Sequence, residues 1–143
     1  MPKFTAERFH DFSAGHRVFG HEGHCARLHG HNYRVHFTIG SNSEDQLDDV
    51  GRVLDFSIIK DRLCEWLETH WDHKFLIWSE DPWAVELAKL DSSVVWLPFN
   101  PTAENLAEWL LVVVGPAELF GTGCNLISVK IEETRKCSAT ILL

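Results

Sequence analysis

Basic residues are scarce in this sequence, and their scarcity excludes one class of partner. Thirteen Lys and Arg stand against 21 Asp and Glu, which gives a formal net charge of −8 over 143 residues. General nucleic-acid binding needs clustered cations for phosphate contacts, so we expect no nucleic-acid partner, although a local basic pocket can still hold a small anion. The composition also lacks the bias of collagen, coiled coils or disordered chains, and the length fits one domain, residues 1–143.

Long apolar runs and paired cysteines are also missing. The most apolar stretch, residues 106–119, contains two Glu, a Gly and a Pro and is too short to cross a bilayer. The first residues carry no apolar segment of secretory type. The four Cys residues include no C-x-x-C pair, which argues against a disulfide framework or a Cys-based zinc finger. We therefore expect a cytoplasmic protein with reduced thiols and no membrane contact.

Strand-like alternation occurs near both ends of the chain. Residues 32–40 (NYRVHFTIG) place apolar side chains on one face and polar ones on the other. Residues 4–13 suit a preceding strand through their aromatic and Thr content. Residues 125–134 alternate Leu126 against Ile127 in the same way and predict a third strand, which residues 136–142 should join as a fourth.

Helical spacing of apolar residues occurs twice in the middle of the chain. It begins after Asp55, where either Asp55 or Ser57 can serve as the N-cap, and again near Thr102, where a Pro-Thr pair supplies a stop and a cap. Gly115-Pro116 is expected to end the second helix. Residues 77–100 read as a long connection with a short helix at 83–90. The coarse order is β-β-α-α-β-β, which is an α+β fold.

Histidine is the residue in excess, and seven of the nine His residues lie between His10 and His36. His29 and His31 are two residues apart in a segment that enters a strand, so both point to the same side and can share a metal ion. Gly30, between them, lets another backbone approach closely. An H-x-H pair also occurs in surface strands without a metal, but the crowding of His favours a site.

A catalytic zinc site uses three protein ligands and keeps one position open. His16, at the end of the first expected strand, is placed to be the third ligand because that strand should pair with the second. His21 and His24 are rival ligands, since spacing alone does not exclude them.

Two further spots can carry chemistry. Cys25 lies in a polar loop among His and Arg, where nearby positive charge would favour a thiolate nucleophile or base, although most structural Cys residues are simply buried. In Asp72-His73, the carboxylate can orient the imidazole, and a helix-end salt bridge is the competing interpretation. Cys64, beside apolar residues on a predicted helix, is expected in the core.

Glu133 is a carboxylate on the inward face of an expected strand. Its parity places it with Val129 and Ile131, and an inward carboxylate needs a partner. That partner is either a neighbouring Arg or Lys, or the donor edge of a ligand.

These pieces together resemble the 6-pyruvoyltetrahydropterin synthase / 6-carboxytetrahydropterin synthase family. The matching motifs run in family order over nearly the whole chain: F-S-A-G-H16-R, C25-x-x-x-H29-G-H31-N-Y, L-D55-F, D72-H73, P-T102-x-E104-N-L and E133-T134. The second of these motifs is specific, and the last two add independent support.

The resemblance implies a T-fold, in which an antiparallel four-stranded sheet carries two helices on one face. It implies assembly into trimeric barrels and a homohexamer, with active sites between subunits. It also implies that Zn²⁺ is bound by three His residues, His16, His29 and His31.

The remaining roles follow from the same resemblance. Cys25 would be the catalytic base, and Asp72 and His73 would complete a proton relay from the adjacent subunit. Glu133 would hold the 2-amino and N3 edge of the pterin, while Thr102 and Glu104 would shape the pterin pocket.

The three-residue gap between Cys25 and H-G-H is typical of the bacterial deazaguanine branch, which feeds queuosine synthesis; the animal biopterin enzymes carry two more residues there. This branch implies a 6-carboxytetrahydropterin synthase that converts 7,8-dihydroneopterin triphosphate to 6-carboxytetrahydropterin, acetaldehyde and triphosphate. Residues 77–100 depart from the short bacterial members by their length. Candidates for triphosphate contact are Arg17, Arg27, Arg34 and Lys74.

Two alternatives stay open at this point. The first is a 6-pyruvoyltetrahydropterin synthase, which keeps the side chain and only eliminates triphosphate. The second is a zinc-binding protein without catalysis, in which Cys25 would be a fourth ligand that closes the site.

Overall fold

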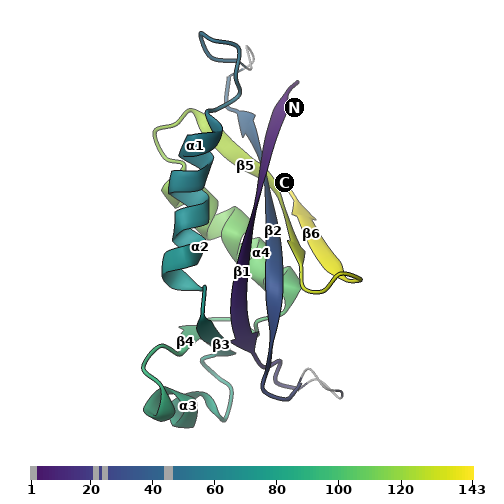
Figure 1. Ribbon diagram of the computed structural model, residues 1–143, viewed down its shortest axis with the longest axis vertical. Coiled ribbons are helices and arrows are strands. Elements are labelled where there is room, and N and C mark those ends of the chain that lie inside the picture. The colour runs from purple at the N-terminus through teal and green to yellow at the C-terminus, as the bar shows by residue number, and fades with distance from the viewer. Residues whose placement is uncertain (1–2, 21–22, 24–25, 44–46) are drawn as a thin grey trace.

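The fold is a curled six-stranded sheet backed by helices (Figure 1). The computed structural model describes residues 3–20, 23, 26–43 and 47–143. The strands stand in the order β4-β3-β1-β2-β5-β6. Their bounds are β1 (Thr5–His16), β2 (His29–Ser41), β3 (Lys74–Trp78), β4 (Val95–Leu97), β5 (Cys124–Glu132) and β6 (Ser138–Leu142).

The expectation of four antiparallel strands is correct for β1, β2, β5 and β6 and wrong for the sheet as a whole. β3 pairs in parallel with β1, and β4 pairs in parallel with β3. Both added strands are short, five and three residues, and a run of that length carries no readable alternation. The stretch 77–100 therefore contains the end of β3 and all of β4, besides the expected short helix α3 (Ala84–Leu90).

Two long helical runs pack on the sheet. The first comprises α1 (Phe56–Ile59), the π-helical turn η2 (Lys60–Cys64) and α2 (Glu65–His70). Asp55 caps it by accepting a hydrogen bond from the Ser57 N–H at 2.9 Å. In Figure 1 this run lies beside β1, and the second run crosses behind β2 and β5.

The second run comprises α4 (Ala103–Trp109), η3 (Leu110–Val114) and α5 (Gly115–Glu118), and it does not end at Gly115-Pro116 as expected. Pro116 directly follows the π-helical turn η3, a local widening of the helix, and it has no N–H to donate back to that turn. Gly115 has a packing role, since an added Cβ would lie 2.6 Å from the Leu126 side chain. Among the described residues, no helix is long and apolar enough to span a membrane.

The core lies between one face of the sheet and these helices. The expected alternation in β2 is confirmed, because its inward side chains are fully buried: Tyr33, Val35, Phe37 and Ile39. In β5 the expected alternation breaks where the β2–β5 register shifts beside Ile39. This irregularity puts Leu126 on the buried face with Val129, so the prediction that they point to opposite faces was wrong.

Candidate metal centre

The ladder between β1 and β2 brings three histidines to one end of the core face. His16 pairs with His29, and Ala14 pairs with His31, so the three imidazoles share a side of the sheet. This register favours Gly at position 30, because the Cβ of any other residue would lie 2.9 Å from the Ala14 carbonyl oxygen. The predicted His trio is therefore assembled by strand pairing.

A carboxylate completes the cluster. Glu133 Oε1 lies 2.9 Å from His31 Nε2 and 3.3 Å from His16 Nε2, while His16 Nε2 lies 3.0 Å from His29 Nε2. One ligand atom from each of these four residues falls within 4.8 Å of all the others. Glu133 points inward as its parity indicates, but its partners are imidazoles, which neither of the two expected pairings included.

The outer nitrogens of two rings are held by backbone carbonyls. His16 Nδ1 lies 2.8 Å from the Pro101 carbonyl oxygen and 3.2 Å from the Tyr33 hydroxyl. His29 Nδ1 lies 2.7 Å from the Arg27 carbonyl oxygen. A carbonyl accepts only from a protonated ring nitrogen, so these contacts leave the Nε2 lone pairs directed into the cluster.

The donor set fits a divalent transition-metal ion. His31 Nε2 is buried and makes no hydrogen bond of acceptable geometry among the described residues. Burial lowers the pKa of His31, which keeps the ring neutral and its lone pair available. The His16 ring, whose Nε2 lies 3.3 Å from Glu133 Oε1, lowers the pKa of Glu133, which keeps that carboxylate charged. Three imidazole nitrogens and one carboxylate form a set that Zn²⁺ commonly accepts.

Two cavities open beside the cluster. The larger, about 980 Å³, is lined by residues that include His31, Asp72, His73 and Glu133. The smaller, about 650 Å³, is lined by His29, His31 and His73 among others. A single chain therefore brings the Asp72-His73 pair to the same walls as two of the cluster residues.

The Asp72-His73 pair has the geometry of an oriented imidazole. Asp72 Oδ2 lies 2.7 Å from His73 Nδ1, and Asp72 Oδ1 accepts a hydrogen bond from the Ser13 N–H at 2.9 Å. Burial alone would raise the pKa of Asp72, but the hydrogen bonds from Ser13 and His73 outweigh it, and the pKa lies below its usual value. His73 has a left-handed backbone (φ 58°) and an 82% exposed side chain, and it lines both cavities.

Other predicted site residues are placed elsewhere or cannot be placed. Thr102 caps α4 by accepting a hydrogen bond from the Asn105 N–H at 3.1 Å, and neither Thr102 nor the exposed Glu104 lines the two cavities. Cys25 lies outside the described residues, as do His21 and His24.

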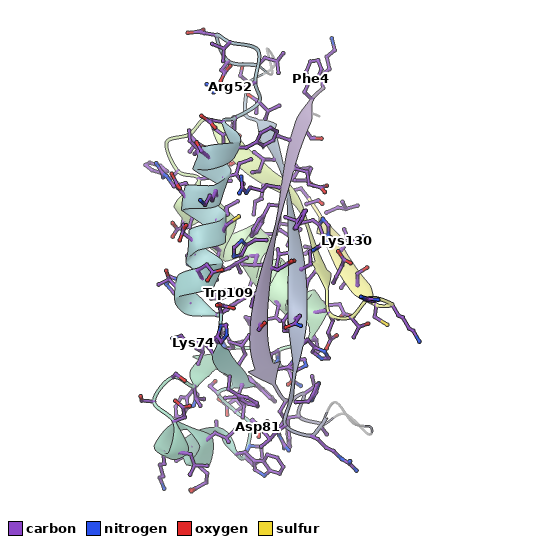
Figure 2. The ribbon with its side chains drawn as sticks, viewed as in Figure 1. Phe4, Arg52, Lys74, Asp81, Trp109 and Lys130 are labelled. Carbon is purple, nitrogen blue, oxygen red and sulfur yellow. The ribbon has the colours of Figure 1, made fainter. Side chains whose placement is uncertain are left out.

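Of the four candidate triphosphate contacts, two form ion pairs with carboxylates of this chain. Arg17 is buried against Asp81, and Arg34 forms a two-point ion pair with Asp11. Lys74 lines the smaller cavity at the end of the molecule where Figure 2 also places Asp81. Arg27 is exposed and lines neither cavity.

One cation of the larger cavity was missed by sequence reasoning. Arg135 lines that cavity and forms no ion pair with the described residues. Its position two residues after Glu133 was the available signal.

Comparisons with known proteins point to one family. A family model described as 6-pyruvoyl tetrahydropterin synthase matches residues 5–142. The 6-carboxy-5,6,7,8-tetrahydropterin synthase of Rickettsia typhi is 34% identical over 132 residues, covering 89% of this chain and 91% of that protein. The protein of the same name from Synechocystis sp. is 32% identical over 124 residues, covering 86% and 81%.

Solved structures agree with this assignment. The 6-pyruvoyl tetrahydropterin synthase of Caenorhabditis elegans matches with a TM-score of 0.72 at 26% identity, covering 100% of this chain and 97% of that one. An uncharacterized protein from Wolinella succinogenes shares the fold with a TM-score of 0.82 at 24% identity, covering 97% of each chain. This chain belongs to the 6-pyruvoyl tetrahydropterin synthase family.

Proposed function

We propose that this chain is a zinc-dependent 6-carboxy-5,6,7,8-tetrahydropterin synthase of queuosine and 7-deazaguanine biosynthesis. Its substrate would be 7,8-dihydroneopterin triphosphate, and its products 6-carboxytetrahydropterin, acetaldehyde and triphosphate. The observation that carries the proposal is a cluster of three His and one Glu beside cavities that also contain an oriented Asp-His pair. The names of the relatives from Rickettsia typhi and Synechocystis support the choice of product.

The cluster residues would hold the metal and one edge of the substrate. His16, His29 and His31 would be the zinc ligands, and the Nε2 lone pairs of His16 and His29 are already directed inward by the outer contacts of those two rings. Bound zinc supplies Lewis acidity toward the side-chain oxygens of the substrate and acidifies the adjacent C–H bonds. Glu133 would accept hydrogen bonds from the 2-amino and N3 groups of the pterin. Its contact with His31 shows that the same carboxylate also reaches the cluster.

Proton transfer would fall to three residues. The Asp72 carboxylate holds the Nδ1 proton of His73, so the other ring nitrogen is free to accept or return a proton at the cavity wall. Cys25, which lies four residues before His29, would act as the thiolate base. Lys74, Arg34 and Arg135 line the cavities, and Arg34 is engaged by Asp11. Lys74 and Arg135 would therefore contact the triphosphate.

A second copy of the chain would complete the pocket. Thr102 and Glu104 line neither cavity in one chain, although both belong to the motif that resembles the family's pterin pocket. We therefore assign them to a neighbouring subunit's site in a cytoplasmic homohexamer, and each chain would contribute one T-fold domain. Light scattering that gave a monomer would contradict this assignment.

The decisive experiment is a product assay with purified, zinc-loaded protein and 7,8-dihydroneopterin triphosphate. Acetaldehyde together with 6-carboxytetrahydropterin would support the proposal. Triphosphate release without acetaldehyde would favour a 6-pyruvoyltetrahydropterin synthase, the activity named for the Caenorhabditis elegans structure.

The role of Cys25 needs its own variant. C25A should abolish turnover while the zinc content stays unchanged, and C137A, which alters an exposed thiol, should keep both. Zinc loss in C25A would favour a closed, non-catalytic site in which the thiolate is a ligand.

A further inference from the structure

A buried ion pair lies next to the candidate metal centre, outside its ligands. Arg17 and Asp81 are 7% and 4% exposed, and Arg17 Nε donates to Asp81 Oδ2 at 2.8 Å. The guanidinium also lies 3.5 Å from the centre of the Trp83 ring. Asp81 Oδ1 accepts a hydrogen bond from the backbone N–H of Trp83 at 2.8 Å, and this bond fixes the orientation of the carboxylate. Burying two charges costs desolvation energy, so the pair is weak evidence of a contribution to stability.

The pair is connected to one of the cluster histidines by a short chain of contacts. A second nitrogen of Arg17 donates to the Ala26 carbonyl oxygen at 3.0 Å. The next carbonyl in the chain, that of Arg27, accepts the Nδ1 proton of His29 at 2.7 Å. Asp81 therefore orients Arg17, Arg17 holds the backbone at Ala26, and that backbone sets the orientation of the His29 ring.

We propose that Arg17 and Asp81 are positioning residues for the metal centre. They hold the segment 26–28 so that His29 is protonated on Nδ1 and presents its Nε2 lone pair to the cluster. This role gives the connection after β3 a function at the site, and it withdraws Arg17 from the candidates for triphosphate contact. The inference rests on the metal site of the proposed function.

A double variant separates positioning from simple stability. R17M/D81N removes both buried charges but keeps an acceptor for the Trp83 N–H, so thermal unfolding should change little. The Ala26 carbonyl loses its donor, and we expect the Zn²⁺ dissociation constant, measured by chelator competition, to rise at least about tenfold. The Co²⁺ absorption spectrum should change as well, since it reports ligand geometry. The matched control is K89M/E86L, which removes an exposed ion pair on α3 and should leave both readouts unchanged.

The metal-free protein provides a readout that does not depend on the proposed metal. In ¹⁵N NMR spectra of the wild type, His29 should be the Nδ1-protonated tautomer, and in R17M/D81N it should become a mixture of tautomers. If the wild type binds no Zn²⁺, both the proposed metal site and this inference fail.

If the wild type binds Zn²⁺ and R17M/D81N binds it within twofold, with an unchanged His29 tautomer, only the positioning role is overturned. Should the double variant fail to fold, R17K replaces it. Lys keeps the charge but has no planar fork to reach Asp81 and Ala26 together, so its Zn²⁺ affinity should also fall at least about tenfold. An R17K protein with wild-type affinity would overturn the inference.

Discussion

The Nε2 atoms of His16 and His29 face each other at 3.0 Å. Each ring has its Nδ1 against a backbone carbonyl, of Pro101 and Arg27 respectively, so in the neutral state both Nε2 atoms carry lone pairs. Two lone pairs at this distance repel each other unless a proton or a cation lies between them. A metal ion bound by both Nε2 atoms would remove this repulsion.

Metal binding should therefore stabilise the protein. With Zn²⁺ at about 100 times its dissociation constant, the free energy of unfolding should rise by about 2.7 kcal/mol. H29A should reduce this increase to near zero, while H10A, which removes an imidazole paired with Glu68 away from the cluster, should keep it. Calorimetry with and without chelator checks this expectation, and an H29A protein with unchanged zinc stoichiometry would contradict the ligand assignment.

Gly30→Ala should damage the site through the backbone. The added Cβ would lie 2.9 Å from the Ala14 carbonyl oxygen, so β1 and β2 would have to separate beside the cluster. Overpacking of this kind costs about 1–3 kcal/mol of unfolding free energy. We expect that loss in urea unfolding, together with weaker Zn²⁺ binding. A G30A protein with wild-type stability and affinity would show that the strands tolerate the extra atom.

Asp72 should contribute to the pH dependence of stability. Its folded pKa lies below the ordinary value of 3.8, so its contribution is fully present above that pH and is lost as the pH falls through the folded pKa. D72N should lower the unfolding free energy by about 1 kcal/mol at neutral pH, and the difference from wild type should shrink in acid. Urea unfolding from pH 7 to pH 2 measures this. A difference that stays constant over that range would exclude the charge as its cause.

His73 allows catalysis and backbone strain to be separated. Its φ of 58° is a conformation that Asn adopts readily and Ala does not. H73N and H73A should both lose about 10²–10⁴-fold in kcat, because both lack the proton-carrying ring. Only H73A should also lose about 1–2 kcal/mol of unfolding free energy. Full turnover in H73N would exclude the relay.

The elements that were predicted correctly are those whose own sequence decides their structure. The alternation of Tyr33 to Ile39 and the caps at Asp55 and Thr102 are local signals, and the structure has each of them. The parallel strands β3 and β4 were missed because their pairing depends on distant partners, such as Ala14 with Lys74. The second helical run was predicted to end at Gly115, but this Gly instead allows close packing against the Leu126 side chain. That contact is with a distant residue, so no local sequence pattern reveals it.

The site divides in the same way. The two-residue spacing of His29 and His31 puts them on one face of a strand, and the expected strand pairing places His16 beside them. Their convergence could therefore be predicted. The contact of Glu133 with two imidazoles could not, because parity gives the direction of a side chain but not what lies opposite. The burial of Arg17 against Asp81 also escaped prediction, since that pair forms across segments with no shared periodicity.

The continuous ladder from Thr5 with Gly40 to His16 with His29 also limits how this chain can evolve. Inserting or deleting a single residue within either strand would exchange the two faces of that strand beyond the change. In β2 this would turn buried side chains such as Tyr33, or the cluster residues His29 and His31, outward. Length variation among descendants should therefore collect in the loop between the two strands, while the strands themselves change only by substitution. Keeping the three histidines together therefore requires that the pairing register of β1 and β2 be kept.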